Sequence, residues 1–243
     1  MIWKENLVKL KIVKMIESQN KVIKLKTFLK KTRRGKVLKI VREHYLRHDI
    51  GCGSESESIS KENPNFSTLS DNPRQSFPTP HPGRHYIVLD TNIILNQIDV
   101  LEVGIKDGGL GNVIVLQTVL EEVRHRSSPI YKRLKDIIAD PSRRFYVFIN
   151  EHHKDTYIER DPGESANDRN DRAIRVATQW YNNGCEHLQD KNISTILITD
   201  DQENAVKAKT EGLTCFTIKN FLSNAHFGIL NNFCKIITFI VFW

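Results

Sequence analysis

From residue 85 onward, short uninterrupted apolar runs alternate with stretches whose apolar residues recur every three or four positions. Uninterrupted runs are typical of strands buried on both faces, and the wider spacing is typical of helices that cover a sheet. The runs predict strands at residues 86–89, 113–116, 145–149, 195–198 and 215–218. The spaced positions predict helices at residues 92–101, 118–125, 129–138 and 167–181, and a further helix through Ala205 and Ala208 that ends at Gly212.

This alternation predicts an α/β fold. Helices that connect successive parallel strands cross over a face of the sheet and bury it. We therefore expect a three-layer domain with a central parallel sheet of about five strands.

The first third of the chain has a different pattern. Residues 26–47 are basic with interspersed apolar residues, and the segment is too small to fold alone, so we expect it to dock on another surface. Between Gly51 and Gly83, seven serines and five of the eight prolines accompany few aliphatic residues, which predicts a mobile linker. The apolar residues of the basic segment suggest a narrow stripe formed by Leu29, Val37, Leu38, Ile40, Val41, Tyr45 and Leu46.

Charge divides the chain in the same place. Its 243 residues carry 36 Lys and Arg against 29 Asp and Glu, a formal net charge of +7. Residues 1–50 hold 15 basic and 4 acidic residues, a net +11, and the remainder hold 21 and 25, a net −4. This composition excludes a collagen, a disulfide miniprotein and a wholly disordered chain.

The cysteines and the apolar runs bear on the compartment. The four cysteines form no CxxC pair, which favours free thiols in a reducing compartment. No run approaches the roughly 20 apolar residues that span a bilayer. The amino terminus makes a poor secretory signal, and an amphipathic mitochondrial presequence is the less favoured alternative. We therefore expect a soluble, intracellular protein with no membrane partner.

Acidic residues follow the predicted strands at the points where those strands end. Asp90 ends the first strand in LDTN, Glu122 lies on the helix after the second, and Asp201 follows the fourth in ITDD. The helix at 167–181 opens with NDRND, which contains Asp168 and Asp171. The carboxyl ends of parallel strands meet at one edge of a sheet, so these carboxylates would repel one another in a shared cleft. A hard cation such as Mg²⁺ or Mn²⁺ relieves that repulsion and can orient a phosphodiester and activate water.

Each of these acids also has an ordinary structural explanation. An Asp directly after a strand is more often a helix cap than a ligand, and Asp168 is the best candidate for such a cap. Glu122 could complement the positive amino end of its helix, and Asp200 could be a solvated neighbour of Asp201. The metal hypothesis rests on four acids at one edge rather than on any single residue.

These motifs carry a family resemblance. A strand ending in DTN, a helix-borne Glu, NDRND and ITxD resemble the PIN domain, a family of metal-dependent RNA endonucleases. Longer stretches resemble the PIN regions of exosome-associated ribonucleases: KTFLKKTR, KIVREHYLR and DIGCG in the arm, and NVIVLQTVLEEVRHRS, NEHHKDTYIE and NDRNDRAIRVA in the body. The resemblance covers roughly residues 25–53 and 84–222.

The resemblance implies a site and an activity. It implies endonucleolytic cleavage of single-stranded RNA with Mn²⁺ or Mg²⁺, in RNA processing and decay by the exosome. The nucleus, including the nucleolus, is the implied location, with the cytoplasm as a further compartment. Asp90 would be the central metal ligand, and Glu122 would orient the attacking water. The implied catalytic and metal-binding set is Asp90, Glu122, Asp171 and Asp201, with Thr91 and Asn92 positioning Asp90 through hydrogen bonds.

Basic residues near the acids could contact RNA phosphates. The candidates lie in NDRNDRAIR or in the helix predicted at residues 118–125. Pairing with neighbouring acids on a solvated surface is an equally favoured explanation for them. The adjacent His152 and His153 would point apart, so capping or surface roles are favoured over metal binding. The candidate arginines are Arg124, Arg169, Arg172 and Arg175, with Arg126 close by in sequence.

The resemblance also implies a domain order. It divides the chain into an atypical extension (1–24), a basic arm that docks on exosome core subunits together with the PIN surface (25–53), a linker (54–83), the PIN domain (84–222) and an apolar tail (223–243). In the family, the cysteine of DIGCG begins a three-cysteine cluster thought to bind zinc. Cys52 has no companion before Cys185, so we expect no structural zinc there. The large exonuclease domain of the family is also missing from this sequence, so exonuclease activity is not expected.

Two other functions compete with the endonuclease. The chain could be a tethering module that holds a ribonuclease on the exosome core, an interpretation that the basic arm favours. A nucleotide-binding α/β domain is disfavoured because neither G-x-G-x-x-G nor a Walker loop follows the first strand.

Overall fold

The structure, a computed structural model, describes residues 21–56 and 68–223, which form two compact units. The first unit comprises residues 21–50 together with Glu151–Tyr157, and the second comprises residues 51–56, 68–150 and 158–223. The expectations for residues 1–20, for the middle of the linker at 57–67 and for the apolar tail from 224 onward lie outside the described residues.

The second unit is built around a five-stranded sheet with the strand order β5-β4-β3-β6-β7. Every neighbouring pair in it is parallel. All residues of β3 and β4 are buried, which explains why their sequences are uninterrupted apolar runs. The α/β fold with a central parallel sheet is therefore confirmed. Its strands are β3 (His85–Leu89), β4 (Val113–Leu116), β5 (Phe145–Phe148), β6 (Ser194–Ile198) and β7 (Cys215–Phe216).

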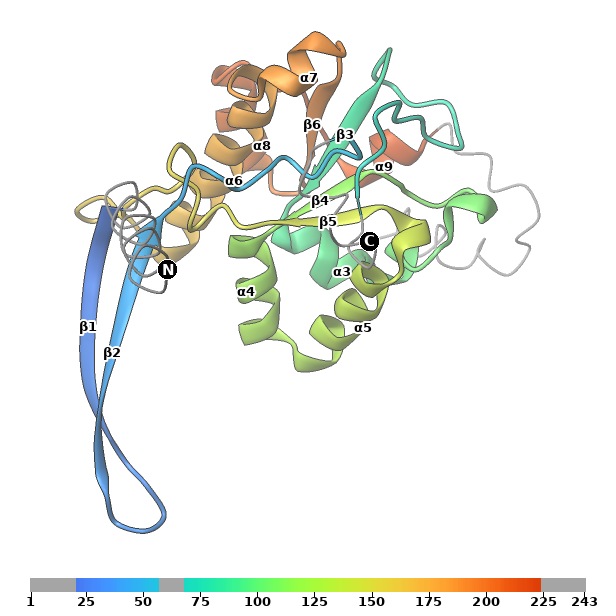
Figure 1. Cartoon of the computed structure of the whole chain (residues 1–243). Helices are drawn as coiled ribbons and strands as arrows, with labels where there is room; N and C mark the ends of the chain where they lie inside the picture. Colours follow the sequence, from blue (N-terminus) through green and yellow to red (C-terminus); the bar gives the residue numbers. More distant parts are fainter. Residues whose placement is uncertain (1–20, 57–67, 224–243) are drawn as a thin grey trace, which may run out of the picture. The chain divides into compact units, whose positions relative to one another are not determined.

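Helices cover both faces of this sheet, with α3, α4 and α5 on one side and α6, α7 and α8 on the other (Figure 1). The predicted helices are confirmed to within two residues, but α7 was not predicted, and Ile218 begins α9 instead of ending the last strand. The helices are α3 (Thr91–Leu101), α4 (Gln117–Arg126), α5 (Ser128–Ala139), α6 (Ala166–Asn183), α7 (Glu186–Asp190), α8 (Gln202–Thr210) and α9 (Ile218–Leu222), with 3₁₀ turns η1 (Ile105–Asp107) and η2 (Pro141–Arg143).

The strand order places a change of direction at β3. The chain runs outward from β3 to β4 and β5, and then returns to add β6 and β7 on the other side of β3. In open parallel sheets, the crevice at the carboxyl ends of the strands beside such a reversal is the usual ligand site. The reversal therefore lies between the ends of β4, β3 and β6, where the predicted acids follow their strands.

The described parts of the expected linker belong to the second unit. Leu69 and Phe77 are buried, and Leu69 pairs with the segment before residue 57 because its N–H donates to the Gly53 carbonyl at 2.8 Å. The Glu55 N–H donates in turn to the Leu69 carbonyl at 3.0 Å. The expectation of a mobile linker is therefore wrong for residues 54–56 and 68–83, since a few well-placed apolar residues suffice to hold a polar segment against the sheet.

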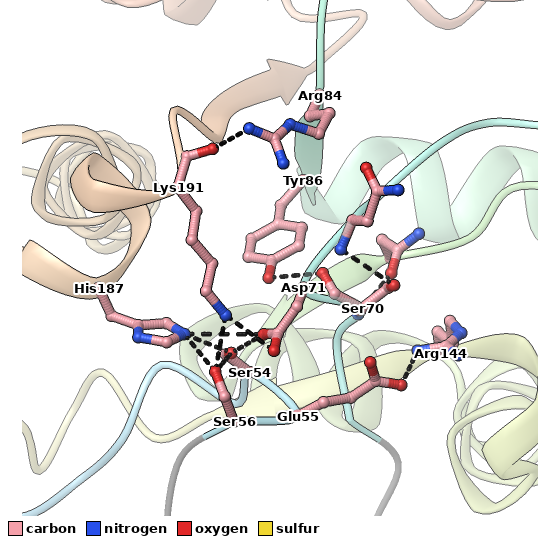
Figure 2. Close-up of polar contacts among 12 residues, drawn as sticks. Ser54, Glu55, Ser56, Ser70, Asp71, Arg84, Tyr86, Arg144, His187 and Lys191 are labelled. Carbon is pink, nitrogen blue, oxygen red and sulfur yellow. Dashed lines mark hydrogen bonds and ion pairs between the residues drawn. The ribbon is translucent and has the colours of Figure 1, made fainter.

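A polar cluster joins this segment to α7 (Figure 2). We call it the Asp71 cluster: Ser54, Ser56, Asp71, His187 and Lys191. The Lys191 ammonium lies 2.7 Å from Asp71 Oδ2 and donates to Ser56 Oγ at 2.7 Å, and the Ser54 hydroxyl donates to Asp71 Oδ1. His187 Nε2 lies 2.7 Å from Ser54 Oγ and 2.8 Å from Ser56 Oγ. The cluster fixes the residues on both sides of the 57–67 segment.

The first unit is an antiparallel hairpin of β1 (Lys21–Lys31) and β2 (Val37–Leu46). Gly35, with φ 81°, sits in its turn, where the left-handed conformation favours glycine. Because side chains alternate between the two faces of a strand, Val37, Val41 and Tyr45 share one face of β2 and Leu38 lies on the other. The single apolar stripe expected for this segment is therefore wrong.

The hairpin unit also includes a segment that the sequence placed inside the PIN domain. Lys154 N–H donates to the Arg47 carbonyl at 2.9 Å, and Arg47 N–H donates to the His152 carbonyl at 2.7 Å. The His44 ring lies 2.7 Å from the Glu151 carbonyl through Nε2 and packs edge-on against Tyr157. Residues 151–157 are thus part of the hairpin unit, although they follow β5 in sequence. Among the described helices, none has the length and apolar character needed to cross a membrane.

Candidate active site

Asp90 is the most enclosed of the predicted acids. It follows β3, caps α3 by accepting from Thr91 N–H through Oδ1 at 2.5 Å, and is 2% exposed. Burial raises the pKa of Asp90, and the hydrogen bonds that it accepts oppose that rise. Its Oδ2 accepts three bonds, from Thr199 Oγ1 at 2.5 Å, Asn204 Nδ2 at 3.0 Å and Asn92 Nδ2 at 3.1 Å.

The ends of β3 and β6 are joined by side-chain hydrogen bonds. Asn92 Nδ2 donates to Thr199 Oγ1 at 3.1 Å, and Asp201 N–H donates to the same hydroxyl oxygen at 3.0 Å. Asp201 caps α8 by accepting from Asn204 N–H at 3.0 Å. Asp200 instead accepts from Ile218 N–H at 3.0 Å, which ties it to α9. Asp200 N–H donates to Asn92 Oδ1 at 3.2 Å, but the Asp200 carboxylate is engaged with α9, whereas Asp201 acts electrostatically on Asp90.

Glu122 approaches the same place from α4. Its Oε2 accepts from Thr91 Oγ1 and from Asn170 Nδ2, both at 3.1 Å, and its Oε1 lies 2.6 Å from Arg126 Nη2. Thr91 directly follows Asp90 in the chain and therefore links Glu122 to Asp90. Asn170 links Glu122 to α6, the helix that carries Asp171.

The pKa of Asp171 depends in part on the charges of the other three acids. Its partial burial, together with the negative charges of Asp90, Asp201 and Glu122, raises its pKa to about 7, and Arg175 acts in the opposite direction. Burial and nearby like charges each raise the pKa of a carboxyl, and the like charges that act on Asp171 are those of the other three predicted acids. The structure thus brings together the four predicted acids, which come from β3, α4, α6 and the loop before α8.

The donor set suits a hard divalent cation. All four side chains offer carboxylate oxygens, which are the ligands that Mg²⁺ and Mn²⁺ prefer, and their excess negative charge is of the kind that a cation relieves. Among residues 21–56 and 68–223, however, no group of three or more His, Cys, Asp or Glu side chains forms a ready-made metal cage. The chemistry of the four acids fits the cation, and side-chain movement would have to complete its coordination.

Helix capping was the structural alternative to metal binding for these acids. Two of them do cap helices, and the third, Asp168, does not. Asp90 and Asp201 do cap helices. Asp168 does not cap α6 itself: Ser165 is the cap, and it accepts from Asp168 N–H at 3.0 Å and donates to Asp168 Oδ2 at 2.6 Å. Asp168 is exposed and serves the start of this helix.

The candidate RNA-binding arginines have different surroundings. Arg175 is only 5% exposed, so it is not available to phosphates and its assignment to RNA binding is wrong. Arg172 makes two contacts of 2.8 Å with Glu164, as the ion-pair alternative expects. Arg169 donates to the Ile158 carbonyl at 2.7 Å. Arg124 is exposed on α4 and has no hydrogen bond or ion pair with the described residues.

The two histidines have structural roles, as favoured from sequence. His153 is buried, and its Nδ1 accepts from Asp155 N–H at 3.3 Å. Burial lowers the pKa of His153, so its ring is held neutral. His152 Nδ1 lies 3.3 Å from the Tyr45 carbonyl.

Sequence reasoning missed three polar residues that surround the acids: Thr199, Asn170 and Asn204. Thr199 is a polar residue at the end of an apolar run, directly before Asp200, and that position was a usable signal. Asn170 lies inside NDRND between Asp168 and Asp171, the two residues of this motif for which the sequence suggests a role. Asn204 stands three residues after a capping Asp, where an ordinary helix surface residue is the default expectation.

Comparison with known proteins agrees with this arrangement. The PIN domain family profile matches residues 87–219. The chain is 51% identical over 207 residues to the mouse protein named Exosome complex exonuclease RRP44, covering 84% of this chain and 21% of the mouse protein. It is 41% identical over 204 residues to Exosome complex exonuclease RRP44 homolog A of Arabidopsis thaliana, covering 84% and 19%. The chain thus spans about a fifth of the length of these relatives.

A solved structure shows the same fold. The T. brucei RRP44 PIN domain aligns with a TM-score of 0.56 and 25% identity over 79% of this chain and 99% of that domain. The family match spans more than half of the chain and includes all four acids at the edge of the sheet. By sequence and by fold, the chain belongs to the PIN domain family.

Proposed function

We propose that the chain is a metal-dependent endoribonuclease that cleaves single-stranded RNA. The observation that carries this proposal is the gathering of four carboxylates at one edge of the sheet: Thr91 joins Glu122 to the surroundings of Asp90, and the charges of Asp90, Asp201 and Glu122 all act on Asp171. Strongly perturbed carboxyls in a cleft at a sheet reversal are typical of catalytic sites. A structural role gives no reason to keep four acids in mutual repulsion.

The four acids would hold Mn²⁺ or Mg²⁺, which supplies positive charge for the phosphate and lowers the pKa of an attacking water. Asp90 is held rigidly for this role, since four donors surround its carboxylate. Thr91 and Asn170 fix Glu122 at the side of the site. Arg124, exposed on α4, is the candidate that stays available to a phosphate.

The names of the relatives support a partner complex. Both relatives are named as exosome complex exonucleases, which supports our proposal that this chain acts with the exosome. We further propose that it does so in RNA processing and decay, in the nucleus. The proposed contribution of the PIN domain is internal cleavage.

Opening of a circular single-stranded RNA in Mn²⁺ tests the activity, because a circle has no ends and only internal cleavage opens it. The variants are Asp171→Asn and the matched control Asp168→Asn, which lies one turn earlier on α6 and is exposed. We expect the wild type and Asp168→Asn to open the circle and Asp171→Asn to lose at least about 100-fold in rate. Equal cleavage by all three would indicate a contaminating nuclease, and no cleavage by any folded protein would refute the proposal.

Docking on the exosome core is a second function, favoured by the hairpin. One of its faces presents exposed apolar side chains, with Leu29 71% and Val37 60% exposed, accompanied by Val41 and Tyr45. Leu29 pairs with Lys39, whose side chain lies on the same face as those of Val37 and Val41. An exposed apolar face between basic residues suits a partner with an apolar, acidic surface.

Co-purification with the exosome core tests this docking function. Val41→Asp should reduce recovery of the core at least about tenfold, because it places a charge in the apolar face. Leu38→Asp, on the opposite face of β2, is the matched control and should retain recovery. Both variants should open circular RNA as the wild type does. Equal recovery with both variants would exclude this face as the docking surface.

A further inference from the structure

Arg175 and Asn204 form a buried connection to Asp90. Arg175 Nη1 donates to Asn204 Oδ1 at 2.8 Å, and Asn204 Nδ2 donates to Asp90 Oδ2 at 3.0 Å. The three residues are 5%, 2% and 2% exposed. Arg175 lies on α6, Asn204 on α8 and Asp90 at the end of β3, so the connection crosses three elements.

The chemistry of the groups fixes the direction of each bond. A guanidinium has donors and no acceptor, so the amide of Asn204 must turn its oxygen toward Arg175. Its NH₂ group is then obliged to face Asp90. If the amide turned over, its oxygen would oppose the Asp90 carboxylate and its NH₂ would oppose the guanidinium, and both contacts would be repulsive.

The charge of Arg175 is balanced within the same network. Arg175 Nε donates to Glu211 Oε1 at 2.8 Å, at the end of α8. One guanidinium therefore contacts the first turn of α8 through Asn204 and the residue that follows the end of α8 through Glu211. Because Arg175 is also one turn after Asp171 on α6, it sets the distance between the helix that carries Asp171 and the helix that Asp201 caps.

We propose that Arg175 and Asn204 are positioning residues, with Arg175 setting the orientation of the Asn204 amide that holds Asp90 Oδ2 in place. This inference rests on the proposed endonuclease function, which assigns Asp90 its role. Arg175 and Asn204 act through Asp90 and the spacing of α6 and α8.

The test uses the full chain with Asn204→Ala, Arg175→Met and Arg175→Lys. The matched control is Lys207→Met, which breaks the exposed α8 ion pair with Glu203. Three quantities are measured: the affinity for Mn²⁺ alone by calorimetry, kcat and KM for single-stranded RNA, and the melting temperature. Substitution of residues that orient a ligand typically lowers metal affinity or activity about 10- to 100-fold.

We expect Asn204→Ala and Arg175→Met to lower both Mn²⁺ affinity and kcat in that range while KM for RNA changes less than about twofold. Arg175→Lys should show a smaller loss than Arg175→Met. Lys keeps the positive charge but lacks the planar guanidinium that donates to Asn204 and Glu211 at once. Lys207→Met should match the wild type. Since Asn204→Ala opens a buried polar site, Arg175→Lys serves as the milder variant if Asn204→Ala does not fold.

Three results would overturn the inference. The first is Mn²⁺ affinity and kcat within twofold of the wild type in folded Arg175→Met or Asn204→Ala. The second is a loss explained wholly by the unfolded fraction, and the third is a loss confined to KM. If the wild type itself neither binds Mn²⁺ nor opens circular RNA, the proposed function fails and the inference falls with it, which distinguishes the two failures.

Discussion

Asp171 lowers the stability of the folded chain wherever it is ionised. Its pKa of about 7 lies above the ordinary value of 3.8, so the folded state holds its proton more tightly than the unfolded state does. The contribution of Asp171 to the free energy of unfolding should therefore be most favourable below about pH 4 and should decline as the pH rises toward 7. Burial of the Asp171 carboxyl is the main physical reason, and repulsion from Asp90, Asp201 and Glu122 adds to it.

Removal of the charge should consequently stabilise the protein while abolishing cleavage. In metal-free buffer at pH 8, Asp171→Asn should raise the free energy of unfolding by about 1–2 kcal/mol, well under the limit of about 4 kcal/mol that a three-unit shift implies for an unscreened group. The gain should shrink toward pH 4. Urea unfolding at both pH values measures it, and a destabilised Asp171→Asn at pH 8 would contradict the repulsion argument.

Gly53 is required by both its backbone and its surroundings. Its φ is +83°, and a Cβ at this position would lie 2.5 Å from ring atoms of Tyr146. Gly53→Ala should lower the free energy of unfolding by about 2–3 kcal/mol through strain and overlap together. Gly83→Ala is the matched control: φ is +89° and the space is open, so about 1 kcal/mol is expected. Equal losses in urea unfolding would show that the Tyr146 ring moves aside freely.

The candidate site was predictable from the sequence only in its acids. Asp90 directly follows one apolar run and Asp201 lies three residues after the end of another, so their place at one edge of the sheet follows from topology. Asn204 and Arg175 could not be assigned this way. Their roles depend on the packing of α6 against α8, which brings together residues 29 positions apart, and a buried Arg looks in sequence like any basic residue near RNA-binding acids.

At the scale of elements, the same reasoning explains which predictions held. The runs at 113–116 and 195–198 were predicted as strands because burial on both faces leaves them almost entirely apolar, with Thr195 as their one polar residue. The hairpin was missed because the residues of its strands alternate between Lys and aliphatic side chains, a pattern that a helix surface also allows. The turn around Gly35 was its one local signal. The five residues of α7 are too few to show a helical period.

The Asp71 cluster should contribute to the stability of α7. Partial burial acts to raise the pKa of Asp71, but hydrogen bonds from Lys191, Ser54 and Ser56 outweigh it and hold that pKa well below its ordinary value. A carboxyl with a lowered folded pKa adds stability above its unfolded pKa and loses it as the pH falls. The cluster should therefore stabilise the packing of α7 at neutral pH and weaken in acid.

Asp71→Asn tests this expectation. It should lower the free energy of unfolding by about 1 kcal/mol at pH 7, a value reduced for the solvent exposure of the carboxyl, and the difference from wild type should narrow below about pH 4. Asp190→Asn, an exposed acid on α7, should change stability by less than about 0.5 kcal/mol. A loss for Asp71→Asn that is independent of pH would show that hydrogen-bond geometry, rather than charge, holds the cluster.

At the scale of the whole molecule, stability should differ between the two units. The strands β3 and β4 are fully buried, whereas the hairpin has exposed apolar side chains and residues 151–157 as its described support. Hydrogen exchange should be slowest in β3 and β4 and at least about 100-fold faster at residues 31–37 of the hairpin. Exchange of the hairpin at the rate of β3 would instead show that the units unfold together.

The pairing of residues on the two sides of the 57–67 segment has a practical consequence. Gly53 and Leu69 are held together by backbone hydrogen bonds, and the Asp71 cluster reinforces them, so the number of residues between them does not enter the fold. The entropy of closing a loop grows slowly, by about 0.6 kcal/mol for each doubling of its length. A reporter protein inserted after residue 60 should therefore leave the pairing of Gly53 and Leu69 intact.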